Sequence, residues 1–205
     1  KFKTDQESFW ANEFGDNYIQ RNEGDHFLAS NINFYVKALS KAQKINSCIE
    51  FGANIGMNLK ALKLLYPDIN LKGIEINKKA ADELKKLIGE DNVINDSIFN
   101  VEIKNKSDLS LIKGVLIHLN PDMLELVYES LYNASNKYIL IGEYYNPEPV
   151  SIPYRGHNDR LFKRDFAGEF LKKYPDTRLL DYGFSYKNDP VFPQDDITWF
   201  LIKKK

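Results

Sequence analysis

The chain has 205 residues, of which 43% are hydrophobic and 28% are charged, a composition typical of one folded domain and unlike that of disordered or collagen-like chains. Its 28 Lys and Arg residues nearly balance 29 Asp and Glu residues, so no overall field would attract nucleic acid or an acidic membrane. The single cysteine, Cys48, excludes an internal disulfide. No apolar run approaches the roughly 18 residues that span a bilayer, and the residues after Lys1 lack the apolar core of a signal peptide. We therefore expect a cytoplasmic protein whose partners include neither nucleic acid nor a membrane.

The first 43 residues are predicted to form a helical lid. Helical spacing is expected over 5–22 and 31–42, and aromatic residues recur near that spacing in the first of these segments. Two interpretations remain open for the aromatic residues, since they could cap a bound cofactor or only cover one edge of a sheet. The second is favoured for most of them.

After the lid, apolar runs alternate with segments of helical periodicity, which is typical of βα units in a parallel sheet. The predicted strands cover 45–51, 70–76, 92–95, 108–112, 137–143, 178–187 and 197–203, and the predicted helices cover 57–66, 77–88, 121–135 and 164–174. The last two strands are joined by a polar segment, 188–196, which favours an antiparallel pair. The pattern predicts an α/β fold with a seven-stranded, mostly parallel sheet, an antiparallel last strand and helices on both faces.

We interpret the whole chain, 1–205, as one domain. In this division residues 44–143 are the cofactor-binding core, 144–165 are an acceptor loop, and 166–205 supply the last helix and the strand pair.

The first predicted strand runs into a glycine-rich turn, Glu50-Phe51-Gly52-Ala53-Asn54-Ile55-Gly56. Glycine allows the backbone to turn tightly beneath a ligand, and the helix that follows presents free N–H groups to it. Such a turn is equally expected of a nucleotide-binding dehydrogenase. The sequence therefore predicts a cofactor site here, and residues at the ends of the neighbouring strands must identify the cofactor.

Three features favour S-adenosylmethionine over a dinucleotide. The turn lacks the three-glycine spacing that brings a backbone against pyrophosphate. Glu75 ends the second predicted strand, where a carboxylate can accept both ribose hydroxyls, although NAD enzymes share this feature. Asp96 and Ser97 follow the third strand and offer a carboxylate to an adenine amino group. Together these positions suit adenosine bound across strands one to three.

The order of these residues resembles class I S-adenosylmethionine-dependent methyltransferases, with their Rossmann-like fold. Longer segments resemble, more specifically, the pseudaminic acid biosynthesis-associated methylases. These segments are Phe14-Gly15-Asp16-Asn17-Tyr18-Ile19-Gln20-Arg21-Asn22, Lys113-Gly114-Val115-Leu116-Ile117-His118-Leu119, Pro153-Tyr154-Arg155-Gly156-His157-Asn158-Asp159-Arg160 and Phe192-Pro193-Gln194-Asp195-Asp196-Ile197-Thr198-Trp199-Phe200. The resemblance covers nearly the whole chain and implies a link to nonulosonic acid pathways.

The resemblance also implies roles for individual residues. It assigns the methionine part of the cofactor to the turn, the ribose to Glu75, Ile76 and Asn77, the adenine to Asp96, Ser97 and Ile98, and the methionine amino group to the Lys113-Gly114 backbone. Tyr18 and Arg21 are carried over as lid residues that meet the sulfonium and the methionine carboxylate. For Arg21 a surface ion pair is an equally weighted alternative. The cofactor-binding set is Tyr18, Arg21, Glu50, Phe51, Gly52, Ala53, Asn54, Gly56, Glu75, Ile76, Asn77, Asp96, Ser97, Ile98, Lys113 and Gly114.

The acceptor is expected beside the loops after strands four and five, because the loops after strands one to three hold the cofactor. Residues 144–165 are long for a connection and carry three prolines that bar helix. The loop mixes aromatic rings with guanidinium groups, which suits a small anionic, sugar-like or nucleotide-like acceptor. The predicted substrate-binding residues are Tyr145, Tyr154, Arg155, His157 and Arg160. Alternatively, Arg160 and Arg164 only pair with Asp159, Asp165 or Glu169 and order the loop.

His118 follows the fourth predicted strand and is the candidate catalytic base, because imidazole titrates near neutral pH. The alternative is a structural histidine bonded to loop backbone. The sequence predicts no metal site and leaves the oligomeric state open. Three functions remain: methylation of a small anionic sugar acid or its nucleotide-activated form, methylation of an amine on a peptide or metabolite, and a non-catalytic cofactor-binding partner in a biosynthetic complex.

Overall fold

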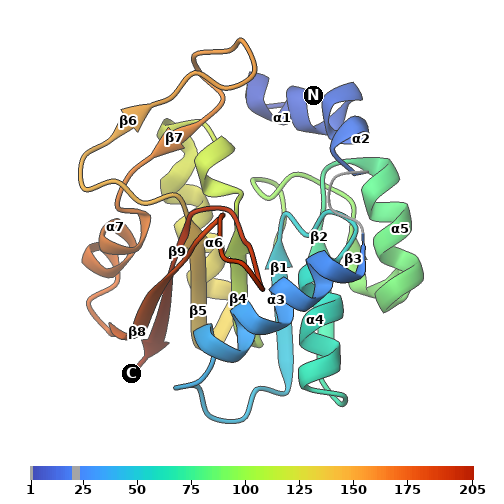
Figure 1. The fold of residues 1–205 in the computed structure, drawn as a ribbon, viewed down its shortest axis with the longest axis vertical. Coiled ribbons are helices and arrows are strands. Elements are labelled where there is room, and N and C mark those ends of the chain that lie inside the picture. The colour runs from blue at the N-terminus through green and yellow to red at the C-terminus, as the bar shows by residue number, and fades with distance from the viewer. Residues whose placement is uncertain (1, 20–23) are drawn as a thin grey trace.

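A computed structural model describes residues 2–19 and 24–205 and shows a seven-stranded sheet flanked by helices (Figure 1). The strands lie in the order β3-β2-β1-β4-β5-β9-β8. Their bounds are β1 Ser47–Phe51, β2 Asn70–Ile74, β3 Val93–Ile94, β4 Ser107–Lys113, β5 Ser135–Glu143, β8 Thr177–Ser185 and β9 Ile197–Lys204.

The strands β1 to β5 are parallel, and β9 pairs antiparallel with both β5 and β8. This confirms the predicted sheet, in which only the last strand is reversed. Each predicted strand lies within a few residues of its observed bounds. A parallel sheet of this kind is buried on both faces, and β5 accordingly consists of buried residues from Tyr138 to Glu143.

Helices cover both faces of the sheet, and two apolar clusters fill the space between them. One cluster joins Phe34 and Leu62 to the sheet, and the other joins Leu131 and Phe170 to its opposite face. The helices are α1 Asp5–Ala11, α2 Glu13–Ile19, α3 Asp25–Ala38, α4 Met57–Leu65, α5 Lys78–Ile88, α6 Leu124–Ala134 and α7 Phe166–Lys173. Three single 3₁₀ turns cover η1 Glu90–Asn92, η2 Leu116–His118 and η3 Pro121–Met123.

The N-terminal region differs from the prediction of one helix over 5–22. The backbone breaks at Asn12, so that α1 and α2 fold back on each other as a short hairpin of helices (Figure 1). The break permits a close approach at Gly15, where an added Cβ would lie 1.9 Å from the carbonyl oxygen of Trp10. The predicted helix 31–42 also begins earlier, at Asp25, and ends at Ala38. We call α1 and α2 the lid helices.

The predicted acceptor loop, 144–165, contains a small second sheet that the sequence did not predict. In it, β6 Val150–Ser151 pairs antiparallel with β7 Phe162–Lys163. Between them, Tyr154 and His157 form a tight turn through two backbone hydrogen bonds of 2.7 and 3.0 Å. The turn places Arg155 and Gly156 at φ values of 50° and 85°, the left-handed region that a primed turn requires at both central residues.

Within the described ranges, every helix is too short or too polar to cross a membrane.

Candidate functional site

A cavity of about 420 Å³ opens at the carboxyl ends of the parallel strands, beneath the lid helices. Loops after β1, β2, β3 and β4 form its floor, because strand order in an open α/β sheet brings these ends to one edge. The lid helices, the start of α3 and the link between β8 and β9 form its walls. The cavity is therefore assembled from segments far apart in the chain.

The glycine turn after β1 lies on the floor of this cavity. Gly52 and Gly56 adopt φ values of 75° and 86°, which side chains other than glycine rarely tolerate. An added Cβ would lie 2.6 Å from Val115 at Gly52 and 2.6 Å from Leu84 at Gly56. These two glycines therefore let the turn pack against its neighbours while Ala53 and Asn54 line the open space.

The carboxylate of Glu75 binds the backbone on both sides of the cavity floor. One oxygen accepts from the N–H of Asn54 and the other from the N–H of Asn77, each at 2.7 Å. Burial raises the pKa of this carboxyl, while the backbone N–H groups oppose the rise. Each oxygen keeps a second lone pair, so the group can accept hydroxyl hydrogens from a ligand in the cavity.

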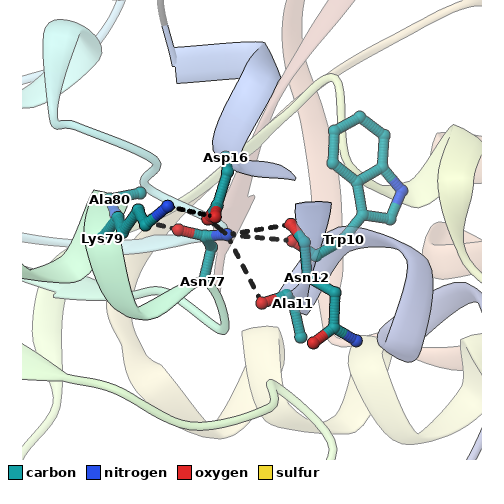
Figure 2. Close-up of polar contacts among 7 residues, drawn as sticks. All are labelled: Trp10, Ala11, Asn12, Asp16, Asn77, Lys79 and Ala80. Carbon is teal, nitrogen blue, oxygen red and sulfur yellow. Dashed lines mark hydrogen bonds and ion pairs between the residues drawn. The ribbon is translucent and has the colours of Figure 1, made fainter. Parts of the chain in front are cut away.

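The side chain of Asn77 contacts the lid, as Figure 2 shows. Its side-chain oxygen accepts from Ala80 N at 3.0 Å and so caps α5. Its side-chain nitrogen donates to Asp16 Oδ1 at 2.9 Å and faces the carbonyl groups that end α1. Lys79 pairs with the other oxygen of Asp16 at 2.5 Å. The lid is thus held by the residue that also binds Glu75.

Aromatic rings from the lid pack over the mouth of the cavity. Trp10 lies against Tyr18, with ring centroids 5.2 Å apart, and against His118, at 4.7 Å. Trp10, Tyr18 and His118 all line the cavity, whereas Phe9 and Phe14 pack outward against the turn at Tyr154–His157. Trp10 and Tyr18 are therefore placed where they could cap a bound cofactor, whereas Phe9 and Phe14 contact this turn.

A buried polar chain runs beneath the turn from Glu50 to Lys113. Asn58 Nδ2 donates to Glu50 Oε1 at 2.6 Å, and Asn58 Oδ1 accepts from Lys113 Nζ at 3.5 Å. Burial raises the pKa of Glu50 to about 8 and lowers that of Lys113 to about 8. Lys113 lines the cavity, while Glu50 lies behind the wall and is fully buried.

Glu143, at the end of β5, fixes the segment that carries His118. Its carboxylate accepts from Val115 N and Leu116 N at 3.0 Å and from Ile117 N at 3.4 Å. These N–H groups belong to the start of η2, so the carboxylate caps that turn. Burial raises the pKa of Glu143 to about 7.

His118 is buried and bonded to the acceptor loop. Its Nδ1 lies 2.7 Å from the carbonyl oxygen of Arg160. Because a carbonyl only accepts, Nδ1 carries the hydrogen and Nε2 is left as an acceptor. Burial lowers the pKa of His118 to about 4, so the ring is neutral at pH 7. The backbone bond of the structural alternative is present, although it reaches Arg160 and not the residues beside Asn120.

The predicted substrate-binding residues lie outside the cavity wall. Arg155 is exposed, and its guanidinium lies over the rings of Phe14 and Tyr154, at 5.6 and 5.4 Å. His157 contacts Phe9, and Tyr145 lies near Phe200. Arg160 pairs with Asp159, and Arg164 pairs with Glu169 at 2.6 Å, as the ordering alternative for this loop expects.

Most of the predicted cofactor residues line the cavity or support its floor. Those that line the cavity are Tyr18, Gly52, Ala53, Asn54, Glu75, Ile76, Asn77, Ser97, Ile98, Lys113 and Gly114. Glu50, Phe51 and Gly56 support the turn from behind. Asp96 lies beside Ser97 in an adjoining hollow of about 190 Å³. Arg21 lies outside the described residues.

Sequence reasoning missed several residues of the cavity wall. His26, Phe27, Ser30 and Asn31 come from the start of α3, whose i, i+1, i+4, i+5 spacing places them on one helical face. Asn58 and the Gln194-Asp195 pair complete this side. His26, Phe27 and Ser30 precede the predicted helix 31–42, and nothing before the first strand indicated that this face meets the cavity. Among the described residues, no group of three or more His, Cys, Asp and Glu side chains is placed to hold a metal ion.

Comparison with solved structures identifies the fold. No protein-family model matches the sequence, and no curated protein matches it either. A Burkholderia thailandensis 1,6-didemethyltoxoflavin-N1-methyltransferase with bound S-adenosylhomocysteine is similar over 97% of this chain and 87% of its own, with a TM-score of 0.70 and 12% identity. The plantazolicin methyltransferase BpumL, in complex with SAH, is similar over 98% of this chain and 94% of its own, with a TM-score of 0.66 and 17% identity.

A third structure, the mitomycin 7-O-methyltransferase MmcR, has a TM-score of 0.68 and 14% identity. The match covers 98% of this chain but only 61% of that longer protein. At these identities the similarity concerns the fold. The chain therefore has the Rossmann-like fold of class I methyltransferases, as predicted from its sequence.

Proposed function

We propose that the protein is an S-adenosylmethionine-dependent methyltransferase. The observation that carries this proposal is Glu75, which is fixed by two backbone N–H groups on the floor of a 420 Å³ cavity and retains lone pairs for ribose hydroxyls. The cavity lies at the strand edge where open α/β sheets bind ligands. The fold, shared with proteins that bind SAH, supports the same function.

The polar groups of the wall fit this cofactor. Asn31 Nδ2, Ser30 Oγ and Trp10 Nε1 are buried and have no partner among the described residues, although all three residues line the cavity. Buried donors without partners are costly, and a polar ligand would satisfy them. When bound, the cofactor supplies an activated methyl group; the protein has only to align it with the acceptor's nucleophilic atom and to accept a proton.

We propose that the acceptor is a small anionic molecule, of the nonulosonic acid type or its nucleotide-activated form. The resemblance of the long motifs supports this class, and Lys187 adds positive charge to the cavity wall. Arg155 is exposed on the turn that packs against Phe14, where its guanidinium can still donate to an anion that approaches past the lid. In this proposal Tyr154 and Arg155 bind the acceptor outside the cavity, and His118 faces it inside.

The neutral His118 favours a second candidate, methylation of an amine. A histidine whose pKa lies near 4 is a weak base, whereas an amine that is already deprotonated needs only a hydrogen-bond acceptor, which Nε2 provides. A hydroxyl acceptor would need stronger assistance. The third candidate, a cofactor-binding partner without catalysis, would bind the cofactor but produce no methylated product.

Incubation with the cofactor and with free or CMP-activated nonulosonic acids, followed by mass spectrometry for a gain of one methyl group, tests the enzyme. Arg155→Lys should reduce acceptor affinity and leave cofactor binding unchanged, because lysine lacks the planar fork. His118→Ala should lower kcat by roughly 10²–10⁴ if the ring is the base. The loss should shrink at high pH for an amine acceptor. Methylation of neutral acceptors alone would contradict the anionic class, and cofactor binding without any methylated product would support the third candidate.

A further inference from the structure

One polar corner of the cavity, where α3 meets the end of β4, has more hydrogen-bond donors than acceptors. Lys113 Nζ lies 3.3 Å from Asn31 Oδ1 and 3.5 Å from Asn58 Oδ1. Gln194 Nε2 donates to the same Asn31 oxygen at 2.8 Å. Two donors therefore fix the orientation of the Asn31 amide, with its oxygen toward Lys113 and its nitrogen turned away.

The unused donors converge on the cavity wall. Asn31 is fully buried and Ser30 is 1% exposed, yet Asn31 Nδ2 and Ser30 Oγ have no partner among the described residues. Lys113 has only two long hydrogen bonds to neutral amides, and the nearest described carboxylates act on it at a distance. All three side chains line the same cavity. The corner thus offers an ammonium, an amide N–H and a hydroxyl to a ligand.

We propose that Lys113, Asn31 and Ser30 bind the methionine carboxylate of the cofactor. This inference rests on the proposed function. It gives the side chain of Lys113 a binding role in addition to the one predicted for the Lys113-Gly114 backbone. It also places the carboxylate contact on the sheet and α3, whereas the resemblance had assigned this contact to Arg21 of the lid.

The charges of this corner fit a carboxylate better than a neutral group. The hydrogen bonds of the Lys113 ammonium go only to amide oxygens, while Glu50, Asp195 and Glu143 attract it from farther away. A direct anionic partner can therefore still bind it, and a carboxylate can accept two or more of the available donors at once. Burial lowers the pKa of Lys113 to about 8, the direction expected for a cation that lacks a close anionic partner. Glu50 cannot take that place directly, since Asn58 lies between it and Lys113.

A comparison of two ligands measures the contribution of this contact to binding. S-Adenosylhomocysteine and 5′-methylthioadenosine share the adenosine and the thioether, but only the first carries the amino acid end. Isothermal titration of both ligands into the full chain measures the ratio of their affinities. In the unsubstituted chain, S-adenosylhomocysteine should bind at least tenfold more tightly.

Asn31→Asp is the most selective variant, because it keeps the oxygen that accepts from Lys113 and Gln194, replaces the donor with a second oxygen and adds a negative charge that repels a ligand carboxylate. It should weaken S-adenosylhomocysteine at least tenfold and leave 5′-methylthioadenosine within about twofold. Lys113→Met and Ser30→Ala should act in the same sense. Lys60→Met, on the exposed face of α4, is the matched lysine control and should change neither affinity.

The possible outcomes distinguish failure of this inference from failure of the proposed function. Equal affinities of the two ligands in the unsubstituted chain, or an equal loss of both in Asn31→Asp, would overturn the carboxylate subsite while leaving the methyltransferase proposal intact. Failure of both ligands to bind the unsubstituted chain would overturn the function itself. Where Lys113→Met does not fold, as judged by circular dichroism, Asn31→Asp and Ser30→Ala decide the result.

Discussion

Nδ1 of His118 and the carbonyl oxygen of Arg160 lie 2.7 Å apart and join the end of β4 to the loop that precedes β7. The bond fixes the ring, and burial keeps it neutral. This side chain should therefore make a pH-dependent contribution to stability.

In the unfolded chain a histidine takes up its proton near pH 6.5, whereas folded His118 does so near pH 4. Between these values the unfolded histidine binds more protons, so its contribution to the free energy of unfolding falls as the pH is lowered from 7.5 to 4, while the raised pKa values of Glu50 and Glu143 act in the opposite direction. The difference corresponds to roughly 3 kcal/mol. His118→Asn, whose amide can still donate to Arg160, should lose this dependence in urea unfolding. The exposed His26→Asn variant is the control, and equal slopes for His118→Asn and the unsubstituted chain would contradict the assignment.

Glu75→Ala should weaken binding of S-adenosylhomocysteine by about 1–3 kcal/mol, because ribose hydroxyls would lose their acceptor in a buried site. Calorimetry measures this directly. Asp96→Ala, in the adjoining hollow, tests the adenine contact separately and should cost less, since Asp96 is exposed. NAD should not bind. Unchanged affinity in Glu75→Ala would remove the residue on which the proposed function rests.

The bond from Asn77 to Asp16 should control opening of the lid. Asp16→Ala removes only the lid contact, so hydrogen exchange should accelerate in residues 5–19 and stay unchanged in α5. Asn77→Ala removes the helix cap as well and should accelerate exchange in both segments, at a cost of about 1 kcal/mol for the cap. Identical exchange patterns in the two variants would show that the cap and the lid contact act as one.

Two glycines allow a matched test of packing against backbone conformation. Gly15→Ala places a Cβ 1.9 Å from the Trp10 carbonyl, so α1 and α2 must separate, and exchange in residues 5–19 should rise. Gly114→Ala meets nothing within 4 Å but retains a φ of 67°, and should lower the free energy of unfolding by about 1–2 kcal/mol without affecting the lid. A normal lid in Gly15→Ala would mean that the helix pair packs differently.

The sheet could be predicted because its strands carry local signals. Apolar runs such as Tyr138–Ile141 are buried on both faces, so a continuous stretch of apolar residues marks them in the sequence. The break at Asn12 could not be predicted in this way, since a capped pair of short helices and one long helix place aromatics at similar spacing. The small sheet β6–β7 was hidden for another reason: two-residue strands leave no period to detect.

The residues of the candidate site likewise include some that local sequence predicts and some that it does not. Gly52, Gly56 and Glu75 follow a strand directly, and sequence order fixes where they lie. Asn31, Gln194 and Glu143 reach the site only through tertiary packing, and their neighbours along the chain give no sign of it. Arg155 is exposed on a tight turn outside the cavity wall, so its residue type suggested an anion site but the sequence did not predict where that site would lie.

Cys48 lies fully buried in the central strand β1, between β2 and β4. Burial raises the pKa of its thiol well above the ordinary value, so a thiol reagent meets neither an accessible nor an ionised sulfur in the folded chain. A central strand such as β1 should be among the last elements to open. The rate at which this sulfur is alkylated should therefore measure unfolding of the whole molecule. A ligand that binds the native state should slow the alkylation of Cys48, and the size of this decrease would give the affinity of the ligand without a label attached beforehand.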